Sequence, residues 1–217
     1  MTLSNNRFIT ASLSKLETET YNPISGFETE PLVSLEEAVQ PIAGLVLDAL
    51  THVETAKEKF INHPNIPINE AAAIYLYTMT IPLYGELNKA LRNEDGSSLK
   101  LWFPYLKLLL TGLYKLPSHS AKVWRGVYNV NASDFKENNI HTWWSITSCS
   151  KSDDFAGGFK CDKGVLFCID SAYGKDITSY SAIPNEQEII LMPGTKLRVT
   201  KVDHDDNGIS TINLTEW

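Results

Sequence analysis

Two glutamates, separated by a single residue, stand at the start of an apolar segment, in the run Pro184-Asn185-Glu186-Gln187-Glu188-Ile189-Ile190-Leu191. Because side chains alternate between the two faces of a strand, an extended backbone places Glu186 and Glu188 on the same side. Neighbouring carboxylates repel each other and lose hydration on burial, so such a pair needs a cation, a metal or a cationic transition state nearby. The alternative is two solvent-facing glutamates at the start of a strand, which are common on protein surfaces.

Two earlier segments carry polar groups that suit an anionic ligand. Arg125 precedes Gly126 in a predicted strand. Its forked guanidinium can hold a phosphate, and the glycine lets a ligand approach the backbone. Ser148 lies in the run Ile146-Thr147-Ser148-Cys149-Ser150, and Ser145 is a competing candidate. The alternatives are an exposed arginine beside a bulge and a serine-rich turn at the end of a strand.

These elements occur in the order arginine, serine and Glu-x-Glu, each on a predicted strand, and together they resemble the active site of the arginine-specific mono-ADP-ribosyltransferases. Residues 123–199 follow this family without a large gap. Two runs also resemble its eukaryotic-type branch: Asn69-Glu70-Ala71-Ala72-Ala73-Ile74-Tyr75-Leu76-Tyr77-Thr78 and Trp124-Arg125-Gly126-Val127. The serine motif departs from the family pattern, since Ile146 replaces an aromatic residue and Cys149 replaces threonine.

The resemblance implies an enzyme that uses NAD as a substrate and needs no metal. Glu188 would bond the 2′-hydroxyl of the nicotinamide ribose and stabilise the positive charge that develops there as nicotinamide leaves. Glu186 would orient the guanidinium of an acceptor arginine and take its proton, since that side chain is always protonated in water. Ser148 would position Glu188 and line the nicotinamide pocket.

Four further roles follow from the same resemblance. Arg125 would clamp the NAD pyrophosphate or the adjoining ribose, and the backbone of Gly126 would bond the nicotinamide carboxamide. Phe159 would stack on nicotinamide, and Tyr180 would contact the acceptor protein. The predicted reaction is therefore transfer of ADP-ribose to an exposed arginine of a protein, with nicotinamide released. The alternatives are an NAD glycohydrolase, in which water replaces the arginine, and a non-catalytic NAD-binding or interaction domain of the same fold.

Composition limits the partners. The 217-residue chain has a net charge of −7, which argues against nonspecific nucleic-acid binding because that needs a cationic surface. The histidines show no metal-ligand spacing with each other or with the cysteines. No apolar run is long enough to span a bilayer, the first residues lack the apolar core of a signal peptide, and three cysteines cannot all pair. These features favour the cytoplasm but leave the location open, and the net charge of −7 without a leftover apolar stripe favours a monomer. The target protein stays open.

The order of elements, helices first and strands afterwards, indicates an α+β fold in which a helical N-terminal lobe precedes a mixed two-sheet β core. We expect a polar arm over residues 1–33 and a single catalytic domain over 34–217. Within that domain, the helical lobe covers 34–118 and the β core covers 119–217.

Local signals place the ends of these elements. Ser34 and Glu37 have capping-box spacing for the first helix, and Asn69 is a candidate N-cap for a central helix. Alternation and turn signals predict strands at 122–128, 142–148, 164–170, 177–181, 187–191, 196–202 and 209–214.

Overall fold

A computed structural model describes residues 9–10, 22–46, 48–61, 65–92, 98–128, 130–152, 164–204 and 210–217. The chain divides into two compact units. The helical unit comprises Asn22–Pro117 and Ile177–Pro184, and the β unit comprises Met1–Tyr21, Ser118–Asp176 and Asn185–Trp217. The helical unit therefore begins at Asn22, inside the polar arm that was expected over residues 1–33. The chain returns to that unit for one short segment just before the two glutamates.

Five α-helices form most of the helical unit: α1 (Leu35–Val39), α2 (Ala49–Glu58), α3 (Ile68–Thr78), α4 (Leu83–Leu91) and α5 (Phe103–Lys115). Short 3-10 helices complete its described part: η2 (Phe27–Thr29), η3 (Gln40–Ile42), η4 (Leu99–Trp102) and η6 (Thr178–Tyr180). Most of α3 is buried, including Ala71, Ala72, Ala73 and Ile74. The prediction that it is the central helix is thereby confirmed.

The start of α1 follows the predicted capping box. The Ser34 hydroxyl accepts from the Glu37 amide at 3.3 Å, and the Glu37 carboxylate accepts from the Ser34 amide at 3.0 Å. The prediction for α3 was wrong, because its N-cap is Pro67. Asn69 lies inside the first turn, and its Oδ1 instead accepts from the Leu35 amide at 3.2 Å. The asparagine therefore ties the beginning of α1 to α3.

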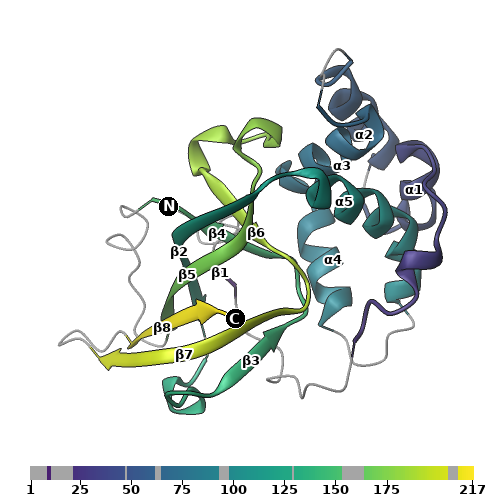
Figure 1. Ribbon diagram of the computed structural model, residues 1–217. Coiled ribbons are helices and arrows are strands. Elements are labelled where there is room, and N and C mark those ends of the chain that lie inside the picture. Colours follow the sequence, from purple (N-terminus) through teal and green to yellow (C-terminus); the bar gives the residue numbers. More distant parts are fainter. Residues whose placement is uncertain are drawn as a thin grey trace. The chain divides into compact units, whose positions relative to one another are not determined.

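The β unit contains eight described strands: β1 (Ile9–Thr10), β2 (Ser118–Tyr128), β3 (Ile140–Trp143), β4 (Thr147–Ser150), β5 (Gly164–Asp176), β6 (Glu188–Leu191), β7 (Thr195–His204) and β8 (Ser210–Glu216). They pair in the order β1-β2-β4-β6-β5-β8-β7-β3. The long strands β2 and β5 also pair along their length (Figure 1), which closes β2, β4, β6 and β5 into a ring. The α+β class is confirmed, but the described strands form one hydrogen-bonded sheet instead of the two sheets that were expected.

Two predicted strands differ from the structure. The segment 142–148 is divided between β3 and β4, because the Gly194 amide bonds the Trp143 carbonyl at 2.8 Å and the chain bends at Ser145. The segment 177–181 is not a strand. The Tyr180 amide bonds the Ile177 carbonyl at 2.8 Å, so the backbone closes into the 3-10 turn of η6.

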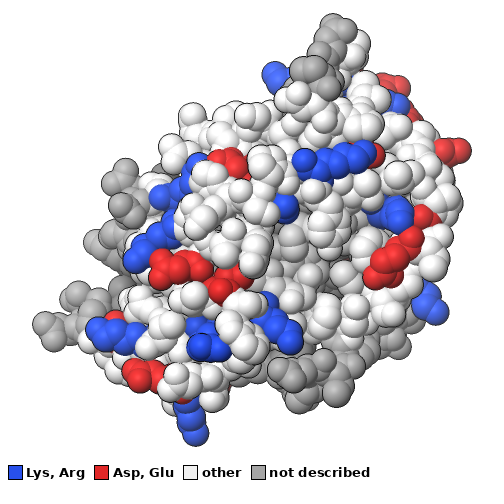
Figure 2. All heavy atoms as spheres, viewed as in Figure 1, with Lys and Arg blue, Asp and Glu red and all other residues white. Residues whose placement is uncertain are grey.

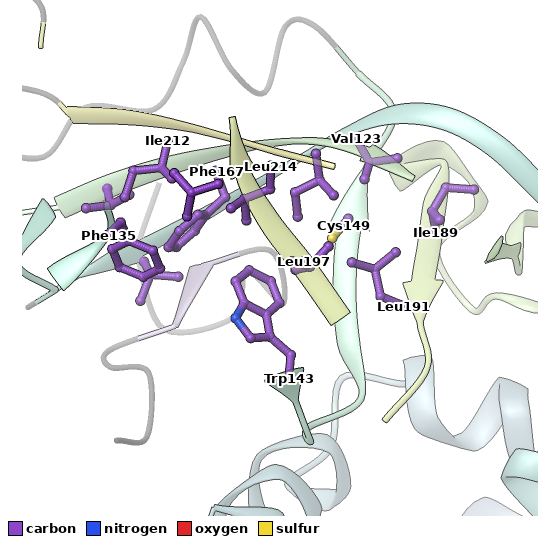
Figure 3. Packing of buried hydrophobic residues seen from close by; sticks show 14 residues of the cluster. Val123, Phe135, Trp143, Cys149, Phe167, Ile189, Leu191, Leu197, Ile212 and Leu214 are labelled. Atoms are coloured by element: carbon purple, nitrogen blue, oxygen red, sulfur yellow. The ribbon is translucent and has the colours of Figure 1, made fainter. Parts of the chain in front are cut away.

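A continuous apolar core fills the β unit. Figure 3 shows side chains of β2, β4, β5, β6, β7 and β8 meeting in it, and Cys149 of β4 is paired with Ile189 of β6. Its buried members are Val123, Val127, Phe135, Trp143, Cys149, Val165, Phe167, Ile169, Ile189, Leu191, Leu197, Val199, Ile212 and Leu214. The strands that carry the candidate site are therefore fixed by packing on their inner side.

Strand β6 also requires a close approach from β5. A Cβ placed on Gly174 would lie 2.6 Å from Ile189 Cγ2 and 2.8 Å from the Ser171 hydroxyl. A larger residue at position 174 would displace β6 at Ile189, the residue that follows Glu188. Only glycine therefore fits there. Among the described helices, none is long and apolar enough to cross a membrane.

Candidate active site

The pairing of β4 with β6 brings the serine motif beside the second glutamate. Ser150 lies directly opposite Glu188, and Ser148 lies opposite Ile190. Directly paired residues of antiparallel strands project to the same face, as do alternate residues along one strand. Ser148, Ser150 and Glu188 therefore share one face of this pair. Both Glu188 and Ser148 are completely buried, with 0% of their surface exposed.

Arg125 of β2 contacts the backbone of the serine motif. Its Nη1 donates a 2.6 Å hydrogen bond to the carbonyl oxygen of Ser148. The side chain is only 4% exposed, so the guanidinium is a buried cation within the β unit. Trp124, the preceding residue, pairs with Ser150. The arginine, the serine motif and Glu188 are thus joined through neighbouring strands, in the order β2, β4 and β6.

The charges of Arg125 and Glu188 both affect the pKa of the Cys149 thiol, in the middle of the serine motif. Burial raises the pKa of Cys149 to about 12, while the positive charge of Arg125 lowers it and the negative charge of Glu188 raises it by smaller amounts. Cys149 Sγ lies 4.0 Å from the Thr147 carbonyl oxygen, and the side chain packs into the core of the β unit. Arg125 and Glu188 therefore both act electrostatically on the residue between Ser148 and Ser150.

Cys149 is expected to resist alkylation in the folded protein. The thiolate is the reactive form, and a fully buried thiol with a pKa of about 12 supplies almost none of it near neutral pH. Iodoacetamide treatment followed by peptide mass spectrometry should leave the Cys149 peptide unmodified in the native protein and modified after denaturation. Rapid labelling of this peptide in the native protein would contradict its position in the core.

The first glutamate does not lie on the strand. Glu186 ends the 3-10 turn η7 (Pro184–Glu186), and β6 begins at Glu188. Between them, Gln187 adopts a left-handed backbone with φ of 48°. The expectation that both carboxylates project to one face of an extended segment was therefore wrong, because the left-handed residue changes the direction of the chain. Glu186 is half-buried, whereas Glu188 is fully buried.

Contacts from the end of β4 hold this change of direction. The Ser150 hydroxyl lies 3.5 Å from the Glu186 carbonyl oxygen, and the Lys151 amide donates to the Gln187 carbonyl at 3.3 Å. The Lys151 ammonium pairs with the Asp176 carboxylate at 2.7 Å. Ser150 thus lies opposite Glu188 and contacts the backbone of Glu186. Sequence reasoning did not select it, although its spacing of two from Ser148 would have placed it on the same face.

The competing serine lies elsewhere in the β unit. Ser145 is in the bend between β3 and β4, where its carbonyl accepts from the Thr147 hydroxyl at 3.2 Å. Ser148, by contrast, is in β4 and paired with β6. The geometry favours Ser148 as the motif serine, and its function stays a prediction.

Three other predicted ligand contacts have different outcomes. Gly126 pairs with Leu166 of β5 and with Ile9 of β1, so strands lie along both sides of its backbone, and its contact with nicotinamide stays a prediction. Phe159 lies outside the described residues. Tyr180 belongs to η6 of the helical unit. It is only 6% exposed and is stacked on Phe60 with ring centroids 5.8 Å apart, which gives it a packing role; its contact with an acceptor stays a prediction.

No group of three or more histidine, cysteine, aspartate or glutamate side chains that could hold a metal occurs in the described part of the chain. On the face drawn in Figure 2, the described lysines and arginines are interspersed with aspartates and glutamates. Arg125 and Glu188 are among the buried charged side chains in the described part of the β unit.

Comparison with known proteins gives a family match. The model of the family described as NAD:arginine ADP-ribosyltransferase matches residues 43–217. Among curated protein sequences, no match is found.

Solved structures share the fold at low sequence identity. The ADP-ribosyltransferase Vis of Vibrio splendidus, in complex with agmatine, has 21% identity and a TM-score of 0.59 over 88% of this chain and 89% of its own. Exoenzyme S of Pseudomonas aeruginosa, bound to carba-NAD, has 20% identity and a TM-score of 0.63 over 84% and 88%. The eucaryotic mono-ADP-ribosyltransferase ART2.2 has 20% identity and a TM-score of 0.62 over 84% and 83%.

The family match covers most of the chain, including both β4 and β6 and the buried arginine on β2. The structural likeness independently gives the same α+β fold. The chain therefore belongs to the NAD:arginine ADP-ribosyltransferase family.

Proposed function

We propose that this protein transfers ADP-ribose from NAD to an arginine side chain of another protein. The observation that carries the proposal is that Arg125, the serine motif and the fully buried Glu188 lie on three neighbouring strands of the β unit, with Arg125 bonded to the backbone of the motif. Membership of the family supports NAD as the substrate. The nature of the acceptor is inferred from the second carboxylate, Glu186.

Glu188 supplies the charge needed for bond cleavage. As the bond between the ribose C1′ and the nicotinamide nitrogen breaks, its electron pair leaves with nicotinamide and positive charge develops on the ribose. A buried carboxylate stabilises that charge more strongly than an exposed one, because water does not screen it. Ser150 lies directly opposite Glu188 and Ser148 lies diagonally across from it on the same face, and the β4–β6 pairing fixes the position of the glutamate.

Arg125 holds the serine motif of β4 in place. Its hydrogen bond to the Ser148 carbonyl fixes β4 against β2, and a guanidinium has further donors with which to bind a phosphate or ribose oxygen of NAD. Glu186 is more exposed than Glu188. In the proposed reaction it holds the acceptor guanidinium, whose nitrogen forms the new bond to C1′, and it takes the proton that this nitrogen loses.

Two structurally similar proteins were solved with compounds of the two kinds that the proposal requires. Exoenzyme S was solved with carba-NAD and Vis with agmatine. Agmatine carries the same guanidinium group as arginine, so it is a suitable small acceptor with which to test this chain.

Replacing Glu186 with glutamine is expected to abolish most transfer to agmatine while leaving nicotinamide release largely intact. Glutamine keeps the size of the side chain but cannot accept the guanidinium proton, and removing a catalytic base costs about 10²–10⁴-fold in rate. The assay incubates the protein with NAD labelled in the adenine ring and follows ADP-ribosyl-agmatine, free ADP-ribose and nicotinamide separately.

The wild-type products separate the candidate functions. Labelled agmatine supports the transferase, whereas free ADP-ribose with agmatine and with a protein mixture alike would favour the glycohydrolase. Equal loss of transfer and hydrolysis in Glu186→Gln would contradict the role given to Glu186. An absence of nicotinamide release under every condition would favour a non-catalytic domain.

A further inference from the structure

The segment that leads to the two glutamates is held by the helical unit, although it follows β5 in the chain. Residues Ile177–Pro184 cluster with Asn22–Pro117 rather than with the strands on either side of them. We refer to Ile177–Pro184 as the approach segment. The conformation of this segment therefore depends on contacts with helices that lie about a hundred residues earlier in the sequence.

A hydroxyl group of α3 holds the approach segment by a hydrogen bond. Thr78, the last residue of α3, is completely buried. Its Oγ1 accepts a 2.8 Å hydrogen bond from the Ala182 amide and donates a 2.7 Å hydrogen bond to the Tyr75 carbonyl of the same helix. Because the second bond fixes the orientation of the hydroxyl, an oxygen lone pair is directed to the Ala182 amide. Neither bond is formed by a residue of the β unit.

Aromatic stacking holds the same segment at a second point. The ring of Tyr180 stacks on Phe60 with centroids 5.8 Å apart, and Phe60 meets Tyr75 edge to face at 5.7 Å. Phe60 follows the end of α2, and Tyr75 lies one turn before Thr78 in α3. Within the segment, the Ile183 amide donates to the Ser181 hydroxyl at 3.0 Å. The segment is thus an ordered turn rather than an unconstrained linker.

The two glutamates differ in how directly they depend on this turn. Glu186 ends η7, which begins at Pro184, the final residue of the approach segment. Glu188 lies beyond the left-handed Gln187 and is fixed by pairing of β6 with β4. A shift of the approach segment would therefore move Glu186 first, whereas the strand pairing would keep Glu188 in place.

We propose that Thr78 is a positioning residue for the acceptor, which acts by holding the approach segment so that Glu186 meets the guanidinium. This proposal rests on the proposed function, since it assigns Glu186 to the acceptor. The link between Thr78 and Glu186 runs along the chain, from Ala182 to Pro184 and into η7. The carboxylate that drives NAD cleavage is independent of it.

Two variants of the full chain test the proposal. Thr78→Val keeps the branched shape but removes the hydroxyl, whereas Thr78→Ser keeps the hydroxyl and is the matched control. Thr78→Val is expected to slow transfer to agmatine about tenfold, because the Ala182 amide loses a buried partner. Nicotinamide release without acceptor should stay within about twofold of the wild type, and Thr78→Ser should preserve both rates.

Hydrogen exchange of peptides that contain Ala182 supplies a readout that does not depend on activity. Exchange should be faster in Thr78→Val and close to the wild type in Thr78→Ser. Unchanged exchange, unchanged transfer, or parallel loss of transfer and nicotinamide release in Thr78→Val would each overturn the proposal. If the wild type transfers nothing to agmatine but exchange still responds to the valine, the proposed function fails while the anchoring of the segment by Thr78 stands.

Discussion

Replacing Glu188 with glutamine is expected to lower the rate of nicotinamide release by about 10²–10³-fold, the usual cost of removing one preorganised electrostatic group from an active site. Glutamine has nearly the same size and can occupy the same place on β6, so the change removes the negative charge and little else. The measurement is nicotinamide release by the purified protein at saturating NAD, with and without agmatine. Both rates should fall together, because bond cleavage precedes transfer and hydrolysis alike.

The folded state should tolerate this change. Glu188 is 0% exposed and lies on a strand fixed by pairing with β4 and by the core packing of Ile189. A buried carboxylate loses hydration on folding, whereas a neutral amide loses less. The melting temperature of Glu188→Gln should therefore equal or exceed that of the wild type. Lost activity together with unchanged stability is the combination that identifies a catalytic carboxylate.

Glu216→Gln is the matched control for charge. Glu216, in β8 of the same unit, accepts hydrogen bonds from the Ser171 hydroxyl and from the amides of Ala172 and Tyr173. Like Glu188, it raises the pKa of Cys149, so its charge acts on the same region. Its replacement should reduce stability by about 1 kcal/mol through weaker hydrogen bonds and leave most NAD cleavage. A comparable loss of rate in both variants, or a Glu188→Gln protein with more than half the wild-type rate, would remove Glu188 from its role.

The sequence was sufficient where a residue's position followed from the periodicity of its own segment. The change from helical to alternating periodicity predicted the helical and β parts, and the strands carrying Arg125, Ser148 and Glu188 were expected in the right order. Their convergence follows from the pairing of β4 with β6 and of β2 with β4. The buried core on the inner side of these strands makes the register definite, because a slip of one residue would expose it.

The position of Glu186 could not be read in the same way. The alternation argument assumes an extended chain, and Gln187 breaks that assumption with a left-handed backbone. Glycine and asparagine are the usual signals for such a conformation, and glutamine is not. The contacts that support it come from Ser150 and Lys151, which are distant in sequence.

The approach segment shows a second reason for failure. Ile177 and Tyr180 suggested a strand because both are residues that favour one. In the structure they are buried against the helical unit, where Tyr180 stacks on Phe60. Long-range packing thus overrides the local preference, and a single sequence carries no signal that pairs these two rings.

Arg125→Lys is expected to lower both activity and stability, which distinguishes it from Glu188→Gln. Lysine keeps the positive charge but lacks the fork that lets one guanidinium bond the Ser148 carbonyl and still donate elsewhere. The lost bond is short, at 2.6 Å, and its donor is 4% exposed. Hydrogen bonds to charged groups contribute about 1.5–3 kcal/mol, so the free energy of unfolding should fall by about that amount. NAD turnover should fall by about 10²-fold as β4 shifts and misplaces Ser148 and Ser150.

The control for Arg125→Lys is Arg198→Lys. Arg198 lies in β7 of the same unit, where its guanidinium stacks over the ring of Trp217 at 4.8 Å from the centroid. That ring is 62% exposed, so a cation can still approach it after the change, and the loss should stay below about 1 kcal/mol. Urea denaturation and NAD turnover, both measured well below the melting temperature, separate the two variants. Wild-type stability in Arg125→Lys would show that the bond to Ser148 does not hold β4. Wild-type turnover combined with reduced stability would instead confine Arg125 to a structural role, because a ligand clamp cannot lose its fork without weakening NAD binding.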